Sequence, residues 1–240
     1  MDPFLRTRWL IGSDAVDHLQ KSCVAVFGVG GVGGFCIEAL ARAGVGRLDI
    51  VDYDRVDVTN INRQIIATTE TVGELKVDVM KARIASIVPE TEVRTHPMMF
   101  SEATAEKIDF RDYDYVVDAV DQVTAKLLII EKAKACGVPV LSAMGAGNKL
   151  HPEALELAML SETKVCPLAR VMRREVKKRG LGDIPVVYST EEPKKIEGME
   201  ERSPASISFV PSAAGLIAAS KVIRDLVQSE KEDSLVRKLQ

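Results

Sequence analysis

The stretch CVAVFGVGGVGGFCIEALARAG, residues 23–44, decides the fold. Its apolar, β-branched start, Cys23 to Gly28, predicts a buried strand. Glycines in the spacing G-x-G-x-x-G follow, and Phe35 to Ala43 has the apolar spacing of a helix. This order lets backbone N–H groups and a helix N-terminus reach phosphate oxygens. The stretch therefore predicts a nucleotide site, with a tight turn that binds no ligand as the alternative.

The rest of the chain continues this alternation. We expect further strands at 47–51, 93–96, 115–118 and 138–143, and helices at 74–88 and 123–136. Beyond residue 150, expected strands at 154–160 and 186–189 flank a charged helix at 168–179, and a last helix covers 212–228. We predict a Rossmann-like α/β fold: a mostly parallel sheet with helices on both faces, extended by antiparallel strands in the C-terminal third.

No linker divides the chain, so we expect one domain over residues 1–240. Its expected parts are an N-terminal arm (1–22), a nucleotide-binding core (23–150) and a substrate-side extension (151–228). The charged, proline-bounded segment at about 190–205 reads as a mobile loop within that extension.

Composition narrows the class of protein. The 240 residues are 46% hydrophobic and 28% charged, with a formal net charge of -3, so a polyanion would need a local basic patch. The four cysteines form no C-x-x-C pair, which favours a reducing compartment over disulfides or zinc. No apolar run suits a signal peptide or a membrane span. We expect a cytoplasmic protein with no membrane contact.

Residues after the second strand indicate which nucleotide is bound. Asp52 ends that strand, where an acidic residue binds ribose in dinucleotide folds, and this alone favours a nicotinamide oxidoreductase. The following DYDRVDVTNINRQ, residues 52–64, adds Arg63, and Lys76 opens the next helix. Two cations suit a triphosphate better than a dinucleotide. A nucleotide-binding module without turnover stays a further alternative.

Two carboxylates, Asp118 and Asp121, follow the fourth strand, at the edge where open α/β sheets bind ligands. A carboxylate there suits Mg²⁺, which keeps several waters and takes one or two protein carboxylates.

Four motifs in order, GVGGVGG, DYDRVDVTNINRQ, VGELK and VDAVD, resemble the ubiquitin-activating-like adenylating superfamily over roughly residues 5–145. Bacterial members of that superfamily use ATP to activate carboxylates. The resemblance implies nucleotide contacts from Gly28, Gly30, Gly31, Gly33, Asp52, Asp54, Asn60, Arg63, Gln64 and Lys76.

Roles follow from the same resemblance. Arg63 and Lys76 would act on the phosphates, and Asp121 would hold Mg²⁺, with Asp118 as the weaker metal candidate. Arg8 resembles an N-terminal arginine that crosses a homodimer interface to the partner's ATP, so it joins the catalytic set; a solvated surface charge is the alternative. A monovalent cation beside ATP is left open.

The C-terminal third narrows the choice. The segments PLARVMRRE (167–175), VVYSTEEP (186–193) and SISFVPSAAGLIAASKVIRDL (206–226) resemble tRNA threonylcarbamoyladenosine dehydratases. The resemblance implies adenylation of the carboxylate of threonylcarbamoyladenosine in tRNA, then cyclisation with release of AMP and pyrophosphate. It leaves room for a sulfur-relay protein as a partner. One departure is Cys166, where that family often has an acidic residue; a thiolate at a helix start is one interpretation and a small packed residue the other.

Two alternatives concern the substrate. The chain could instead adenylate the C-terminal Gly-Gly of a small ubiquitin-like sulfur-carrier protein. A tRNA substrate needs a cationic surface, and five cations recur at helical spacing: Arg170, Arg173, Arg174, Lys177 and Lys178. The competing interpretation of these five is a solvated helix face. The loop at 191–202 is a candidate to close over the modified base, with ordinary disorder as its alternative.

Overall fold

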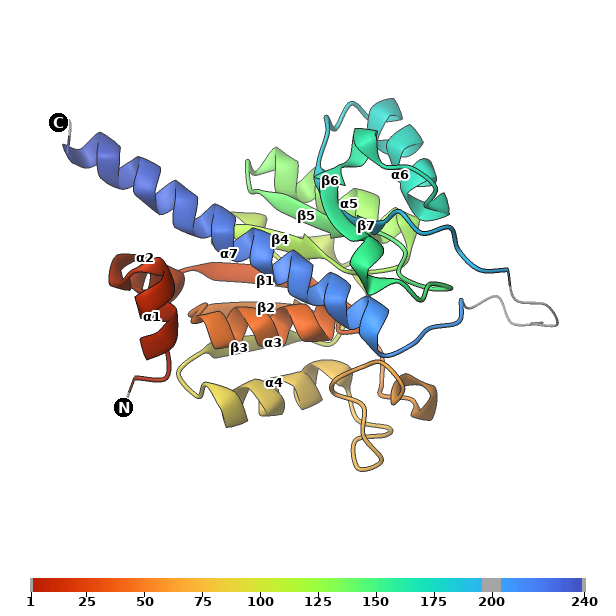
Figure 1. Ribbon diagram of the computed structural model, residues 1–240, viewed down its shortest axis with the longest axis horizontal. Coiled ribbons are helices and arrows are strands. Elements are labelled where there is room, and N and C mark those ends of the chain that lie inside the picture. Colours follow the sequence, from red (N-terminus) through yellow and green to blue (C-terminus); the bar gives the residue numbers. More distant parts are fainter. Residues whose placement is uncertain (1, 196–203, 239–240) are drawn as a thin grey trace.

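Seven strands form one sheet in the computed structural model, which describes residues 2–195 and 204–238 (Figure 1). The strands are β1 (Cys23–Phe27), β2 (Arg47–Val51), β3 (Glu92–His96), β4 (Tyr115–Asp118), β5 (Val140–Ala143), β6 (Leu155–Met159) and β7 (Pro185–Ser189). Their order is β3-β2-β1-β4-β5-β7-β6. Every pairing is parallel except that of β6 with β7. Residues before and after 150 therefore share one sheet.

Helices cover both faces of this sheet. The α-helices are α1 (Leu5–Ile11), α2 (Ser13–Leu19), α3 (Gly33–Ala43), α4 (Lys76–Ile87), α5 (Val123–Ala135), α6 (Pro167–Lys178) and α7 (Phe209–Lys238). Short 3-10 helices are η1 (Val58–Asn60), η2 (Ala105–Lys107), η3 (Phe110–Asp112), η4 (Pro152–Ala154) and η5 (Leu160–Glu162). The described helices include none that is both long and apolar enough to span a bilayer.

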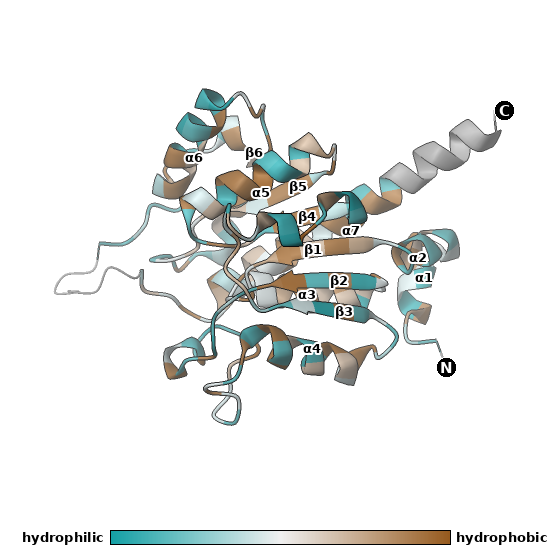
Figure 2. Ribbon diagram, turned by 180° about the vertical axis from the view of Figure 1, so that it is seen from behind, coloured by the Kyte–Doolittle hydropathy of each residue, from teal (hydrophilic) through white to brown (hydrophobic). Residues whose placement is uncertain are grey.

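The central strand β1 is buried on both sides, as a parallel strand between two helical layers must be. Val24 and Val26 belong to the core under α3, α4 and α7, whereas Ala25 and Phe27 belong to the core under α5 and α6. Figure 2 shows β1 as hydrophobic and the edge strand β3 as largely hydrophilic. The sequence of Cys23–Phe27 thus fixes this strand at the centre of the sheet.

The first helical layer is held together partly by charge. Glu38 on α3 accepts hydrogen bonds from Arg42 at 2.8 Å and from Arg83 on α4 at 2.5 Å. Burial by itself raises the pKa of Glu38, but these two arginines outweigh it and lower the pKa below its ordinary value. Glu38 is therefore ionised in the folded protein and ties α3 to α4.

The strand order reverses between β1 and β4. The units β1-α3-β2 and β2-α4-β3 run to one side of β1, whereas β4 lies on its other side and leads away through α5 to β5. Connections that leave in opposite directions open a crevice at the carboxyl ends of β1 and β4, where open α/β sheets bind ligands.

The predicted fold is confirmed: a mostly parallel sheet, helices on both faces and an antiparallel edge. Two details differ. β7 pairs in parallel with β5, so β6 is the antiparallel addition. α7 runs from Phe209 to Lys238 instead of over 212–228; it can begin before Pro211 because a proline in the first turn lacks only an N–H that has no partner within the helix. Of the expected mobile loop, residues 196–203 lie outside the described residues.

Candidate functional site

The glycine turn between β1 and α3 contains glycines of two kinds. A Cβ atom at Gly28 would lie 2.7 Å from the carbonyl oxygen of Ala119, and one at Gly33 would lie 1.8 Å from that of Gly28. These two glycines are required by the packing of the protein itself. A Cβ atom at Gly30 would meet nothing within 4 Å. The packing of the described residues gives no reason for glycine at Gly30, whereas the approach of a ligand to the backbone would give one.

Asp52, at the end of β2, joins that turn to the next loop. Its Oδ2 accepts the N–H of Val29 at 2.6 Å, and its Oδ1 accepts the N–H of Asp54 at 2.8 Å. Burial raises the pKa of Asp52 above its ordinary value, although the two N–H groups oppose that effect. Each carboxylate oxygen keeps a lone pair for a further donor. Asp52 is therefore placed to accept hydrogen bonds from ribose hydroxyls beside the turn.

Lys76 is a buried cation at the first residue of α4. Its side chain is 7% exposed, and Nζ lies 2.8 Å from Oδ2 of Asp54. The backbone N–H of Lys76 also donates to the carbonyl of Asp54 at 3.0 Å. The family resemblance predicts that both residues contact the nucleotide, and the structure brings them together as an ion pair. A partly buried pair of this kind keeps the ammonium in one place.

Arg63 lies beside the glycine turn, with its Cγ 3.5 Å from the Cβ position of Gly31. Its guanidinium donates through Nη1 to the carbonyl of Thr59 at 2.9 Å and to Oδ1 of Asn62 at 2.8 Å. These bonds use one nitrogen, Nη1, and leave the three N–H donors of Nε and Nη2 without a partner among the described residues. Arg63 is thus anchored next to the turn with donors to spare for an anion.

Asn60 and Gln64 belong to the same loop and are both buried. Oδ1 of Asn60 accepts the N–H of Asp57 at 3.1 Å, so this side chain holds η1 closed. Oε1 of Gln64 has no hydrogen-bond partner among the described residues. A buried amide oxygen without a partner is costly, so a donor from a bound molecule would satisfy it.

Tyr53 follows Asp52 at the end of β2 and is exposed, and the charges of three carboxylates act on it. Burial raises the pKa of Tyr53, and the charges of Asp54, Asp121 and Asp52 raise it further. Asp121 follows β4 and Tyr53 follows β2, so both residues belong to the carboxyl edge of the parallel strands. Asp121 is exposed and has no ion-pair partner within the described residues. A free carboxylate beside phosphates fits Mg²⁺, which takes one or two protein carboxylates and otherwise waters and phosphate oxygens.

Asp118 does not fit that role. It is completely buried, 3.0 Å from Nζ of Lys126, and it accepts the hydroxyl of Ser142 at 2.5 Å. The weaker metal candidate, Asp118, is therefore disfavoured, because the ammonium group of Lys126 already neutralises its charge inside the protein.

Arg8 lies at the other end of the sheet. α1 and α2 precede the amino end of β1, whereas the glycine turn follows its carboxyl end. The guanidinium group of Arg8 forms ion pairs with Asp2 at 2.7 Å and with Asp17 at 2.6 Å. Arg8 therefore takes no part in the site of its own chain.

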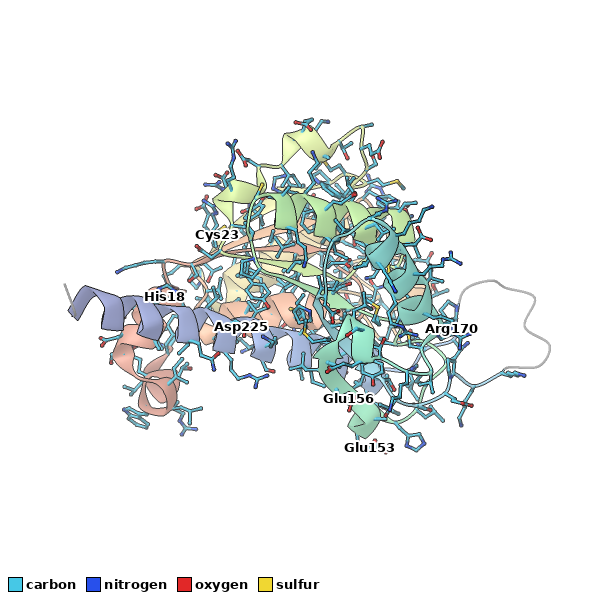
Figure 3. All side chains as sticks on the ribbon, turned by 90° about the horizontal axis from the view of Figure 1, so that it is seen from above. His18, Cys23, Glu153, Glu156, Arg170 and Asp225 are labelled. Carbon is cyan, nitrogen blue, oxygen red and sulfur yellow. The ribbon has the colours of Figure 1, made fainter. Side chains whose placement is uncertain are left out.

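The cations of α6 are less uniform than their spacing predicted. Arg170, Arg174, Lys177 and Lys178 are exposed. Arg173 instead folds back and donates to the carbonyl of Thr163 at 2.8 Å and to its hydroxyl. Four of the five predicted cations are thus exposed, and Arg173 is not. Of the four, Arg174 pairs with Glu175 at 3.1 Å, and the other three have no ion pair among the described residues. Figure 3 places Arg170 at the end of the molecule opposite His18 of α2.

Cys166, at the start of α6, is buried. Reactive cysteines are partly exposed, so its position favours the interpretation as a packed small residue.

Contacts that the sequence did not reveal join distant loops to the site. Nδ2 of Asn62 donates to the carbonyl of Ser206 at 3.0 Å. Asn148 donates its N–H to the carbonyl of Ala205, and its Oδ1 accepts the N–H of Ala205, each at 2.7 Å. Lys126, which lies within an apolar helix, was also not identified from the sequence as part of the site. Its position shortly after the motif VDAVD was the one indication in the sequence.

Known proteins resemble this chain along nearly its whole length. The sequence pattern of the ThiF family matches residues 5–240. The tRNA threonylcarbamoyladenosine dehydratase of Bacillus subtilis is 43% identical over 242 residues, covering 94% of each chain. A crystal structure of Escherichia coli tRNA N6-threonylcarbamoyladenosine dehydratase in complex with ATP superposes with a TM-score of 0.88, at 30% identity and 96% coverage of each chain.

A sulfur-carrier protein adenylyltransferase of Thermus thermophilus is 37% identical over 131 residues, which cover 55% of this chain and 48% of that protein. The resemblance to the dehydratases is thus the more complete of the two. The chain belongs to the ThiF family and, within it, to the tRNA threonylcarbamoyladenosine dehydratases.

Proposed function

We propose that this protein uses ATP to adenylate the carboxylate of threonylcarbamoyladenosine in tRNA and then cyclises it, releasing AMP and pyrophosphate. One observation carries the choice of nucleotide: two cations flank the glycine turn, with Lys76 buried against Asp54 and Arg63 packed beside Gly31. A dinucleotide does not need both, whereas a triphosphate that must lose pyrophosphate does. Relatives named as tRNA threonylcarbamoyladenosine dehydratases supply the substrate class.

In the first step an oxygen of the substrate carboxylate attacks the α-phosphorus of ATP. The bond from that phosphorus to the bridging oxygen breaks, and its electron pair leaves with pyrophosphate. The carboxylate is already ionised near neutral pH, so no side-chain base is needed. Backbone N–H groups around Gly30, with Arg63 and Lys76, neutralise charge on the phosphates. Alignment of the reacting atoms can contribute about 7–11 kcal/mol.

In the second step the neighbouring urea group of the same nucleoside attacks the activated carbonyl. AMP leaves with the former carboxylate oxygen, the urea group loses a proton, and the ring closes. The substrate becomes lighter by the elements of one water. Because the nucleophile belongs to the substrate, the buried Cys166 has no task in this step.

Mg²⁺ would be held at Asp121, with waters and phosphate oxygens completing its coordination. Bound there, it supplies positive charge to the phosphates and to the leaving pyrophosphate. Asp121 is exposed, and its charge acts on Tyr53 together with those of Asp52 and Asp54, which supports this role. A monovalent cation and a sulfur-relay partner stay predictions of the family resemblance.

A homodimer would bring Arg8 to a nucleotide. α1, which carries Arg8, also presents Trp9 and Leu10 with 73% and 85% of their surface exposed. Adjacent large apolar side chains of this exposure support burial against a second copy. To contact the partner's ATP, Arg8 must exchange Asp2 and Asp17 for phosphate oxygens. That exchange replaces exposed surface ion pairs, which are weak.

The four exposed cations of α6 are the proposed contacts to tRNA phosphates, by electrostatic attraction that weakens with salt. A tRNA substrate also favours a cytoplasmic location.

Exchange of radiolabelled pyrophosphate into ATP tests the proposal, because adenylation runs backwards only when the correct carboxylate is bound. We expect exchange with tRNA that carries threonylcarbamoyladenosine and none with tRNA that lacks the modification. Exchange that depends on a small Gly-Gly carrier protein and ignores tRNA would instead establish the sulfur-carrier alternative. Binding of NAD in preference to ATP would indicate the oxidoreductase instead. Binding of ATP with no pyrophosphate exchange in the presence of any of these substrates would indicate a nucleotide-binding module without turnover.

A further inference from the structure

A buried ion pair lies beneath the segment that carries Asp121. The side chains of Lys126, on α5, and Asp118, at the end of β4, are both 0% exposed. Their Nζ and Oδ2 atoms lie 3.0 Å apart. A buried ion pair loses much of its attraction to desolvation, and replacing both partners with apolar groups is often harmless. A contribution to stability therefore does not by itself account for this pair. The backbone groups to which the two side chains are hydrogen-bonded indicate another role.

The pair holds both backbone groups of one residue, Val120. Nζ of Lys126 donates to the carbonyl of Val120 at 2.9 Å, and Oδ1 of Asp118 accepts the N–H of Val120 at 3.2 Å. Lys126 also donates to the carbonyl of Ala143 at 2.8 Å, and Ser142 completes the shell of Asp118. One donor of Lys126 and one oxygen of Asp118 thus hold the two peptide groups on either side of Val120, next to Asp121.

The same segment is fixed from its other side by the glycine turn. The N–H of Ala119 donates to the carbonyl of Phe27 at 2.8 Å. A Cβ atom at Gly28 would lie only 2.7 Å from the carbonyl oxygen of Ala119, so the two backbones are in direct contact. Any shift of Val120 would therefore change the position of Asp121 relative to the phosphate-binding turn.

We infer that Lys126 is a positioning residue for the proposed reaction. Acting through Asp118 and the peptide groups of Val120, it sets where the Asp121 carboxylate meets the phosphates and their Mg²⁺. This inference rests on the proposed role of Asp121 as the metal ligand. It assigns the buried pair to the geometry of the metal site and not to the stability of the fold.

The test uses the neutral double variant Lys126→Met/Asp118→Asn, which leaves no unpaired buried charge. The measurement is ATP affinity by titration calorimetry, once with Mg²⁺ and once with excess chelator. The ratio of the two affinities reports the metal contribution, and a loss of stability alone does not move it. We expect that ratio to fall roughly 10- to 100-fold, as for lost outer-shell partners of metal ligands.

Lys149→Met is the matched control. Lys149 is also a buried lysine, but its Nζ donates to the carbonyls of Ser189 and Glu191, away from Asp121. We expect this variant to lower the melting temperature and to leave the affinity ratio unchanged. An equal fall of the ratio in both lysine variants would overturn the inference, because it would show a general effect of buried lysines.

Asp121→Asn separates failure of the inference from failure of the proposed metal site. If Asp121→Asn lowers the ratio and the double variant does not, the positioning role is refuted while the metal site stands. If Asp121→Asn leaves the ratio unchanged, the metal assignment fails and the inference with it. Should the double variant not fold, Ser142→Ala removes only one hydroxyl from Asp118. A smaller fall of the ratio then supports the inference, and an unchanged ratio overturns it.

Discussion

Replacing Gly30 by alanine adds one Cβ atom, which we expect to weaken ATP binding without weakening the fold. A Cβ atom there meets nothing within 4 Å, and the backbone is outside the left-handed region. Alanine should therefore be tolerated and should raise the free energy of unfolding by about 0.4–1 kcal/mol, because it restricts the unfolded chain. For a domain of this size that corresponds to roughly 1–4 °C in melting temperature. The folded protein itself should be unchanged.

Binding of ATP should respond in the opposite direction. The added methyl group occupies the space through which a phosphate would reach the backbone N–H groups. One charge-assisted hydrogen bond contributes about 1.5–3 kcal/mol. We therefore expect the Kd for ATP to rise roughly 10- to 150-fold in Gly30→Ala. Calorimetric titration with ATP and thermal unfolding of the same sample measure both effects.

Two other glycines provide matched controls. Alanine at Gly33 would place Cβ 1.8 Å from the carbonyl of Gly28, and alanine at Gly46 would place it 1.9 Å from that of Gln20, far from the turn. Both variants should be destabilised, and Gly46→Ala should bind ATP normally in whatever fraction folds. If Gly30→Ala binds ATP with unchanged affinity, no phosphate approaches this backbone. If the Gly30→Ala variant is destabilised as much as Gly33→Ala, the space around the Cβ position of Gly30 is not open in the folded protein.

Three further predictions concern charges. Arg63→Ala should abolish pyrophosphate exchange with little loss of stability, because the side chain lies beside the turn and only Nη1 is bonded among the described residues; near-normal exchange would refute its role. Mixed dimers of Arg8→Ala and Lys76→Ala subunits should regain activity in the one site that is intact, and no recovery would contradict the crossing arrangement. Glu38→Gln should lower the free energy of unfolding at neutral pH by about 1–3 kcal/mol. Because the folded-state pKa is lowered, that contribution is present above the ordinary glutamate pKa of about 4.3 and is lost as pH falls through the folded value. Urea unfolding across this range checks it, and a pH-independent difference would contradict it.

The residues that the sequence located well are those set by local pattern. Gly28 and Asp52 follow apolar strands, so their place at the carboxyl edge follows from the strands alone. What the sequence could not predict depends on side-chain direction and on distant partners. Asp118 and Asp121 are equivalent in the motif, yet only Asp118 meets Lys126 inside the protein.

The substrate side of the molecule was harder to predict for the same reason. Arg173 has the same helical spacing as its cationic neighbours, but its guanidinium is hydrogen-bonded to Thr163, ten positions earlier in the chain. Asn62 contacts a carbonyl 144 residues further along the chain, a distance no local pattern spans. Periodicity therefore predicts which face a residue occupies and leaves its partner to the tertiary fold.

The mass of the modified nucleoside tests the central claim most directly. Purified protein is incubated with tRNA carrying threonylcarbamoyladenosine, ATP and Mg²⁺, and the tRNA is then digested to nucleosides for mass spectrometry. We expect the modified nucleoside to become lighter by one water, with one AMP formed for each conversion and no change without ATP. Protein that binds ATP and leaves the mass of the nucleoside unchanged would contradict the account.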